Sequence, residues 1–159
     1  MFRVGFGYDS HRLAENRKLV LGGIHIPYDK GCLGHSDGDA LIHAICDALL
    51  GSVALRDIGY HFPDTSADFK DIDSKILLKK TVELLKERAW EIGNIDTTIC
   101  LERPKLKDHI PEMTRILAET MGILKDQICI KATTNEKMGF VGREEGVAAY
   151  AVALVRKIA

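Results

Sequence analysis

Hydrophobic residues along the chain alternate in some stretches and recur at helical spacing in others. Residues 2–8, 19–26, 94–101 and 127–133 are rich in β-branched or aromatic residues, which predicts four strands. In the second of these, Gly22-Gly23 indicates a bulge or a close backbone approach. Residues 27–34 are expected to form a loop. Residues 147–155 are ambiguous, because their alanines favour a helix while their valines and Tyr150 allow a strand.

Three other segments carry hydrophobic residues at i, i+3, i+4 spacing and predict amphipathic helices. The first begins after Ser36 as N-cap and runs to about residue 54, the second spans 74–91 before Gly93, and the third spans 111–121 before Gly122. Residues 56–73 are polar and long for a loop, which favours a functional role. The order of elements predicts an α/β (α+β) class: one domain, residues 1–159, with helices packed on one face of a mixed sheet.

Composition excludes several classes of protein. The 22 basic and 23 acidic residues give a net charge of −1, which argues against non-specific binding to nucleic acid or anionic lipid. No apolar run reaches the roughly 20 residues of a membrane span, and the N-terminus lacks the apolar region of a signal peptide. The four cysteines are scattered with no C-x-x-C pair, so we expect reduced thiols, no structural zinc knuckle or disulfide scaffold, and a cytoplasmic protein.

One group of polar residues has the chemistry of a metal site. Asp9 and His11 alternate just past the first strand, so both side chains can reach one point. His43 lies on the first helix, four residues from both Asp39 and Asp47. If the two segments meet, Asp9, His11 and His43 would form a His₂-carboxylate site with an open position, and Asp47 would orient His43. The alternatives are a surface Asp–His hydrogen bond and a solvated helical stripe.

A second group suits phosphate. Residues 131–137 (K-A-T-T-N-E-K) follow a strand with two hydroxyls, backbone amides and lysines, and Glu136 is a hard ligand for Mg²⁺. The spacing is not that of a P-loop, and a polar turn is the alternative. Residues 104–107 could support a base or phosphate, or simply lead into a helix. Asp57 beside Gly59 could bind a ribose diol, or belong to a surface loop.

Taken together and in this order, these motifs resemble the family of 2-C-methyl-D-erythritol 2,4-cyclodiphosphate synthases of the non-mevalonate isoprenoid route. The matching stretches are G-Y-D-S-H from Gly7, G-G-I-H-I-P from Gly22, H-S-D-G-D-A-L-I-H from His35, D-I-G-Y-H-F-P-D-T from Asp57, P-K-L from Pro104 and K-A-T-T-N-E-K-M-G-F-V-G-R from Lys131. The resemblance implies a ferredoxin-like fold, a last segment that is a strand, and a homotrimer with active sites at subunit interfaces. It also implies the stand-alone enzyme rather than a fusion with a cytidylyltransferase.

The resemblance also implies roles for individual residues. One Zn²⁺ per subunit would be held by Asp9, His11 and His43, and Mg²⁺ or Mn²⁺ by Glu136. The catalytic roles would fall on His35 and Thr134, which would act on substrate phosphates. The other implied substrate contacts are Ser36 at a phosphate; Asp57 and Gly59 at the ribose; Phe62, Pro63, Asp64, Thr65 and Ser66 at the methylerythritol phosphate; Leu101, Pro104, Lys105, Leu106, Lys107, Ala132 and Thr133 at the cytidine; and Phe140 and Arg143 as further contacts.

The activity implied is that of a phosphorus–oxygen lyase. It converts 4-diphosphocytidyl-2-C-methyl-D-erythritol 2-phosphate to 2-C-methyl-D-erythritol 2,4-cyclodiphosphate by metal-assisted attack of the 2-phosphate on the β-phosphate, with release of CMP. The expected partner is this small molecule, with no nucleic acid or membrane, in a bacterial cytosol or a plastid. A metal-dependent phosphohydrolase and a non-catalytic isoprenoid- or nucleotide-binding module are the alternatives.

Overall fold

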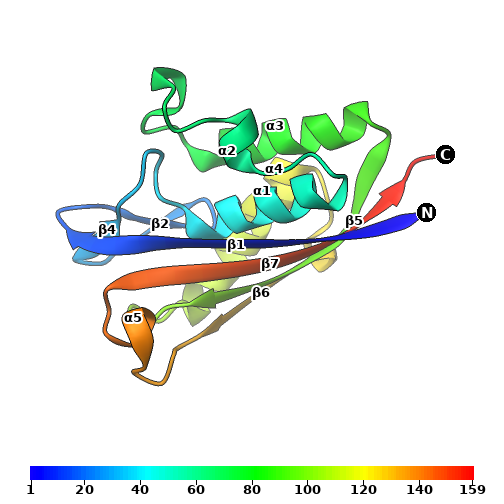
Figure 1. Cartoon of the computed structure of the whole chain (residues 1–159). Coiled ribbons are helices and arrows are strands. Elements are labelled where there is room, and N and C mark those ends of the chain that lie inside the picture. Colours follow the sequence, from blue (N-terminus) through cyan, green and yellow to red (C-terminus); the bar gives the residue numbers. More distant parts are fainter.

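Five strands form one mixed sheet in the computed structural model, which describes residues 1–159. In sheet order these are β4 (Lys30–Cys32), β1 (Phe2–Glu15), β7 (Gly146–Lys157), β5 (Trp90–Cys100) and β6 (Ile128–Thr133). All neighbours are antiparallel except β5 and β6, which are parallel. The last strand of the chain therefore lies between the first strand and β5, which makes β7 the centre of the sheet (Figure 1).

The three long helices cover one face of this sheet (Figure 1). They are α1 (Ala40–Ser52), α3 (Ser74–Glu87) and α4 (Ile110–Met121). Shorter elements are the helices α2 (Ile58–His61) and α5 (Gly139–Gly142), the 3₁₀ turns Ala67–Phe69, Lys107–His109 and Lys125–Gln127, and a hairpin of β2 (Leu19–Leu21) and β3 (Ile24–Ile26). A cluster of 35 buried residues holds the two layers together. This confirms the expected α+β class, with helices on one face of a mixed sheet in a ferredoxin-like two-layer arrangement. None of the helices is both long and apolar enough to span a bilayer.

Several predicted boundaries were wrong. Strand β1 continues to Glu15, so Asp9 and His11 lie within the strand and not beyond its end. Residues 19–26 form two strands, because Gly22 and Gly23 both have positive φ (61° and 78°) and reverse the chain. Within the expected loop 27–34, β4 pairs with the extension of β1.

The second helix and the last segment also differ from the simplest interpretation of the sequence. Helix α3 ends at Glu87 and not at residue 91, because Ala89 adopts a left-handed φ of 58° and Trp90 begins β5. Gly93 therefore lies at an irregularity within β5 instead of ending a helix. Residues 147–155 are part of β7, as the family resemblance implied.

The N-cap of α1 is Asp39 and not Ser36. Its carboxylate accepts hydrogen bonds from the backbone N–H of Ile42, Gly22 and Gly23, at 3.0, 3.0 and 2.7 Å. Asp39 is fully buried. These three hydrogen bonds offset the cost of burying the carboxylate. The Asp39 side chain thus both caps α1 and holds the β2–β3 turn against this helix.

Helix α1 packs directly on the backbone of β1. A Cβ added to Gly5 would lie 1.8 Å from the carbonyl oxygen of Ala48, and one added to Gly7 would lie 1.8 Å from that of Ala44. Because glycines on the strand face alanines on the helix, no bulky side chain holds the two backbones apart. This close packing brings the side chain of His43 near those of Asp9 and His11.

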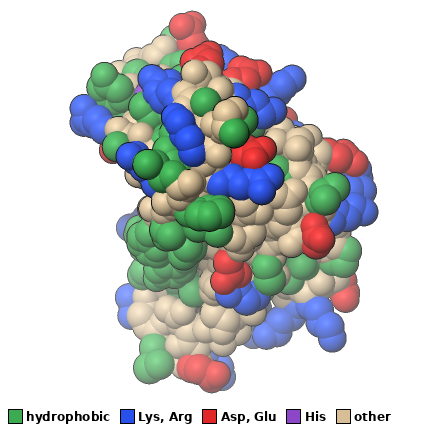
Figure 2. All heavy atoms as spheres, turned by 90° about the vertical axis from the view of Figure 1, so that its right-hand side faces the viewer, with side chains coloured by type: hydrophobic (Ala, Val, Ile, Leu, Met, Phe, Trp, Pro, Cys, Tyr) green, Lys and Arg blue, Asp and Glu red, His purple; other side chains and the backbone are tan.

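The face of the sheet opposite the helices carries exposed hydrophobic side chains, which we call the bare face. Its members project from alternate positions of β1 and β7: Val4, Phe6, Tyr8, Tyr150 and Val152, which are 38–66% exposed. Figure 2, viewed from the end where the termini lie, shows hydrophobic side chains gathered at the left edge of the molecule, near mid-height. A contiguous apolar face of this kind is typical of a protein–protein interface.

Candidate metal centre and ligand hollows

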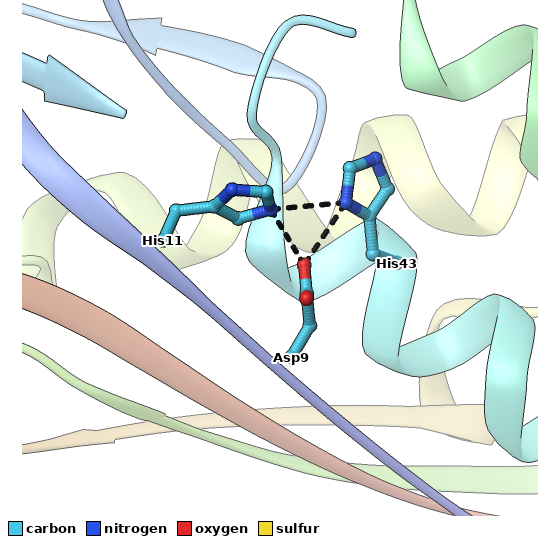
Figure 3. Close-up of side chains that lie close together, drawn as sticks. All are labelled: Asp9, His11 and His43. Carbon is cyan, nitrogen blue, oxygen red and sulfur yellow. Dashed lines mark hydrogen bonds and ion pairs between the residues drawn. The ribbon is translucent and has the colours of Figure 1, made fainter. Parts of the chain in front are cut away.

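Asp9, His11 and His43 converge on one point (Figure 3). Asp9 Oδ2 lies 2.7 Å from His11 Nε2 and 2.9 Å from His43 Nδ1, and the two nitrogens are 3.2 Å apart. The structure therefore brings Asp9 and His11 of β1 together with His43 of α1, as the sequence predicted.

The donor atoms fit a tetrahedral metal ion. Two imidazoles and one carboxylate are ligands that Zn²⁺ accepts, at about 2.0–2.2 Å, which places neighbouring donors about 3.3 Å apart. The three donor atoms are 2.7–3.2 Å apart, so they would need to move apart only slightly to surround such an ion. Three protein ligands leave a fourth position for another ligand, as in catalytic metal sites.

The chain orients the metal-facing nitrogen of His11. Its Nδ1 lies 2.8 Å from the carbonyl oxygen of Leu33, which can only accept a hydrogen bond. Nδ1 therefore carries the proton in the neutral ring, and Nε2 presents its lone pair to the site.

His43 is held from its other side by two serines. Its Nε2 lies 2.9 Å from Ser74 Oγ and 3.1 Å from Ser36 Oγ. The expectation that Asp47 orients His43 was wrong. Asp47 Oδ1 instead accepts a hydrogen bond from the backbone N–H of Ile58, at 2.8 Å, because it lies one turn further along α1, opposite the start of α2.

The carboxylate shapes the electrostatics of the cluster. Burial raises the pKa of Asp9, but hydrogen bonds from His11 and His43 outweigh it and lower the pKa to about 2. Burial lowers the pKa of His11, but the hydrogen bond and charge of Asp9 raise it above 6.5 overall. Asp9 is therefore ionised at neutral pH and attracts a cation to this point.

The cluster lies in a hollow of about 270 Å³, which we call the His43 hollow. Its wall combines His35 and Ser36 with residues of the loop 56–73 and of α3: Ile58, Gly59, Phe62, Asp64, Phe69, Ile72 and Leu77. His35 is fixed by a contact of 3.0 Å between its Nε2 and the carbonyl oxygen of Ser66. The sequence did not predict that Phe69, Ile72 and Leu77 would line this hollow, because apolar residues outside a motif give no sign of the cavity that they face.

Not every residue expected at the loop reaches this hollow. Asp57 Oδ1 accepts from Tyr60 N at 2.9 Å and so caps α2. Ser66 caps the following 3₁₀ turn through Asp68 N. Pro63 and Thr65 do not line the hollow either.

A second hollow of about 280 Å³, the Leu101 hollow, collects the residues that the resemblance implied for cytidine. It is lined by Leu101, Pro104, Lys105, Leu106, Lys107, Ile110, Ala132, Thr133 and Thr134. Only Ile110 was not anticipated. The ends of the parallel strands β5 and β6 form its floor.

Next to it, the turn 134–137 is held in an uncommon conformation. Glu136 and Lys137 have left-handed φ values of 53° and 60°. The Glu102 carboxylate accepts hydrogen bonds from the backbone N–H of Asn135 and Lys137, at 3.1 and 3.0 Å, which stabilises this strained turn. The sequence carried no signal for this role of Glu102.

Phe140 and Arg143 line neither hollow. Phe140 lines a shallow depression with His11 and Arg12 at the end of β1. Arg143 pairs with Glu145, at 2.8 Å between Nε and Oε1.

The two main hollows share no residue, and they lie at different strands of the sheet. Asp9 pairs with Ala149, Ala149 with Ile99, and Ile99 with Ala132. Three strand spacings, about 14 Å, therefore separate the metal cluster on β1 from the floor of the Leu101 hollow on β6.

Comparisons with known proteins agree with this geometry. A 2-C-methyl-D-erythritol 2,4-cyclodiphosphate synthase of Bacteroides fragilis is 64% identical over 156 residues, covering 98% of each chain. A solved structure of such a synthase bound to CDP is 38% identical with a TM-score of 0.90, over 97% of this chain and 100% of that one. The bifunctional IspDF of Campylobacter jejuni is 40% identical with a TM-score of 0.96, over 99% of this chain and 43% of its own. The family model described as YgbB matches residues 2–156, and the chain belongs to this family.

Proposed function

We propose that this protein converts 4-diphosphocytidyl-2-C-methyl-D-erythritol 2-phosphate to 2-C-methyl-D-erythritol 2,4-cyclodiphosphate and CMP. The observation that carries the proposal is the convergence of Asp9, His11 and His43 in a hollow, in a chain 64% identical to a synthase of that name. In this reaction a 2-phosphate oxygen bonds to the β-phosphorus. The bond from that phosphorus to the oxygen bridging the α-phosphate breaks, and CMP leaves with that oxygen.

The chain supplies positioning rather than a strong base. The attacking phosphate is already an anion, and bringing two anionic groups together can account for about 7–11 kcal/mol of such a barrier. His35 and Ser36 lie at the His43 hollow, where the Ser36 hydroxyl can donate to the 2-phosphate and His35 shapes the wall beside it. Thr134 lies at the Leu101 hollow, where its hydroxyl can donate to the diphosphate arm. The solved relative bound to CDP supports cytidine as the occupant of this second hollow.

Two different metal ions are assigned. Asp9, His11 and His43 would hold Zn²⁺, whose mixed nitrogen and oxygen ligands they match, and Glu136 would hold Mg²⁺ or Mn²⁺ as a hard carboxylate ligand. Bound metal supplies Lewis-acid stabilisation of phosphate charge.

The active sites are proposed to lie between subunits of a homotrimer. Two observations support this. The two hollows of one chain stand apart, and the bare face, with Phe6 63% exposed, needs a partner. In this arrangement the His43 hollow of one subunit faces the Leu101 hollow of the next. Cytoplasmic localisation remains a prediction.

The test is incubation of the protein with the proposed substrate and Mg²⁺, followed by ³¹P NMR and chromatography. We expect CMP and a cyclic diphosphate in equal amounts, with strong loss of both in Asp9→Asn. Release of inorganic phosphate would instead show a phosphohydrolase, and binding without turnover would show a non-catalytic module.

A further inference from the structure

Behind His43, on the side away from Asp9, the side chains of Ser74 and Asp37 continue a chain of hydrogen bonds that starts at the histidine ring. Asp37 Oδ1 lies 2.5 Å from Ser74 Oγ, and Ser74 Oγ lies 2.9 Å from His43 Nε2. The second oxygen of Asp37 accepts from the backbone N–H of Ser74 at 2.9 Å, so the pair is fixed by two bonds. Ser74 is fully buried and His43 is 6% exposed.

The direction of these bonds follows from what each group can do. A carboxylate only accepts, so the hydroxyl hydrogen of Ser74 points to Asp37. Ser74 Oγ then has only lone pairs to offer, and His43 Nε2 must carry the proton that it donates to Ser74. In the ring that binds a metal ion the proton therefore lies on Nε2, and Nδ1, the atom that faces Asp9, offers its lone pair; in the metal-free ring Nδ1 can still donate to Asp9.

Ser36 meets the same nitrogen from a different position. Its Oγ is 3.1 Å from His43 Nε2, and no carboxylate fixes the direction of its hydrogen. A hydroxyl that is free to rotate can either donate to Nε2 or accept from it, so Ser36 is compatible with both tautomers. Only Ser74, whose hydrogen is directed to Asp37, fixes the proton on Nε2.

We propose that Asp37 and Ser74 are positioning residues that hold His43 in the tautomer able to bind a metal ion, whereas Ser36 makes no such contribution. The inference rests on the proposed metal site. It assigns to Asp37 and Ser74 a role that no motif suggested, since they stand 37 positions apart in the chain. A hydrogen-bonded partner behind a ligating histidine typically changes metal affinity by about 10–100-fold.

The first test measures zinc affinity by competition with a chromophoric chelator in three variants. Ser74→Ala is expected to weaken zinc binding about 10–100-fold, and Asp37→Asn to weaken it less, because Asn can still accept from the hydroxyl. Ser36→Ala is the matched control, since it removes a hydroxyl from the same nitrogen. It should bind zinc as tightly as the wild type or more tightly. Equal weakening by the two serine variants, or no weakening by Ser74→Ala, would overturn the proposal.

The second test needs no metal and separates positioning from loss of structure. With ¹⁵N-labelled histidine in chelator-treated protein, the Nε2–H proton of His43, assigned by its absence in His43→Gln, should be observed in the wild type and in Ser36→Ala, because Ser74 accepts it. In Ser74→Ala this signal should be weakened or lost. An unchanged Nε2–H signal in Ser74→Ala would contradict the proposed role of Asp37 and Ser74. It would leave the proposed reaction standing, because that is tested by product formation in the wild type.

Discussion

Gly7 of β1 and Ala44 of α1 are in direct backbone contact: a Cβ on Gly7 would lie 1.8 Å from the carbonyl oxygen of Ala44. His43, the neighbour of Ala44, bonds to Asp9, two residues beyond Gly7. The metal cluster therefore depends on how closely this helix approaches this strand.

Replacing Gly7 by alanine should lower the free energy of unfolding by about 3 kcal/mol or more, because the added methyl overlaps helix backbone that cannot rotate away. Chemical denaturation measures this, and zinc content should fall with it as α1 is pushed off β1. Gly51→Ala is the control. Gly51 lies in α1 with nothing near its Cβ position, so this change should raise stability by about 0.5–1 kcal/mol.

Removing one metal ligand should remove the metal. Purified wild-type protein is expected to hold one zinc per chain by atomic spectroscopy, and His43→Ala much less than one. His25→Ala serves as the comparison, because His25 is exposed on β3 and should leave zinc content unchanged. A full equivalent of zinc in His43→Ala would refute the ligand assignment.

Chelator-treated protein should show the coupling between Asp9 and His11. Burial lowers the pKa of His11, whereas Asp9, and to a smaller extent the Leu33 carbonyl and Asp39, raise it above 6.5, so Asp9→Asn should lower this pKa. A raised histidine pKa stabilises the fold below 6.5, and that contribution is lost as pH rises through the folded-state pKa. Wild-type stability should therefore fall across this pH range, and the fall should be smaller in the variant. NMR titration of His11, together with unfolding curves at several pH values, checks both effects.

The two metal ions should be separable by mutation. Glu136→Gln removes a charged oxygen ligand that is not part of the Asp9, His11 and His43 cluster, so it should retain zinc but need much more Mg²⁺ for turnover. The measurement is the rate of CMP release against Mg²⁺ concentration, together with zinc content. Normal activity at limiting Mg²⁺ would rule out the assigned role of Glu136.

Shared active sites can be tested by mixing two inactive variants. Asp9→Asn should disable only the His43 hollow and Thr134→Ala only the Leu101 hollow, so each homotrimer should be nearly inactive. In trimers mixed at random and in equal amounts, about one interface in four joins two intact halves, so activity near a quarter of wild type is expected. Co-expression with two affinity tags isolates the mixed trimers. Each of these has one intact interface in three, so the isolated fraction should show about a third of wild-type activity. If they are no more active than the parents, each site lies within a single chain.

The sequence alone was sufficient for the local features. Hydrophobic spacing placed the three long helices and the strands β1, β5 and β6, because burial of one face imposes that spacing wherever an element packs. It left the central strand β7 ambiguous, and only the family resemblance indicated a strand there. The chemistry of Asp9, His11, His43 and the 131–137 segment was also visible, since these residue types suit metal and phosphate in any fold. Boundaries failed where long-range contacts decide them, as at Asp39, whose carboxylate caps α1 only because the β2–β3 turn lies beside it.

Tertiary structure decided which of these features work together. Asp9 and His43 are 34 positions apart, and only the glycine–alanine contact of β1 with α1 joins them. Nothing in the sequence indicated that Asp37 and Ser74 would form hydrogen bonds behind His43. The spacing of Asp47 suggested a hydrogen bond to His43, but Asp47 instead accepts from the backbone of Ile58. The physical reason is that a side-chain hydrogen bond needs its partners within about 3 Å and correctly directed. Periodicity sets which face of an element a residue occupies, but the packing of elements sets what that face meets.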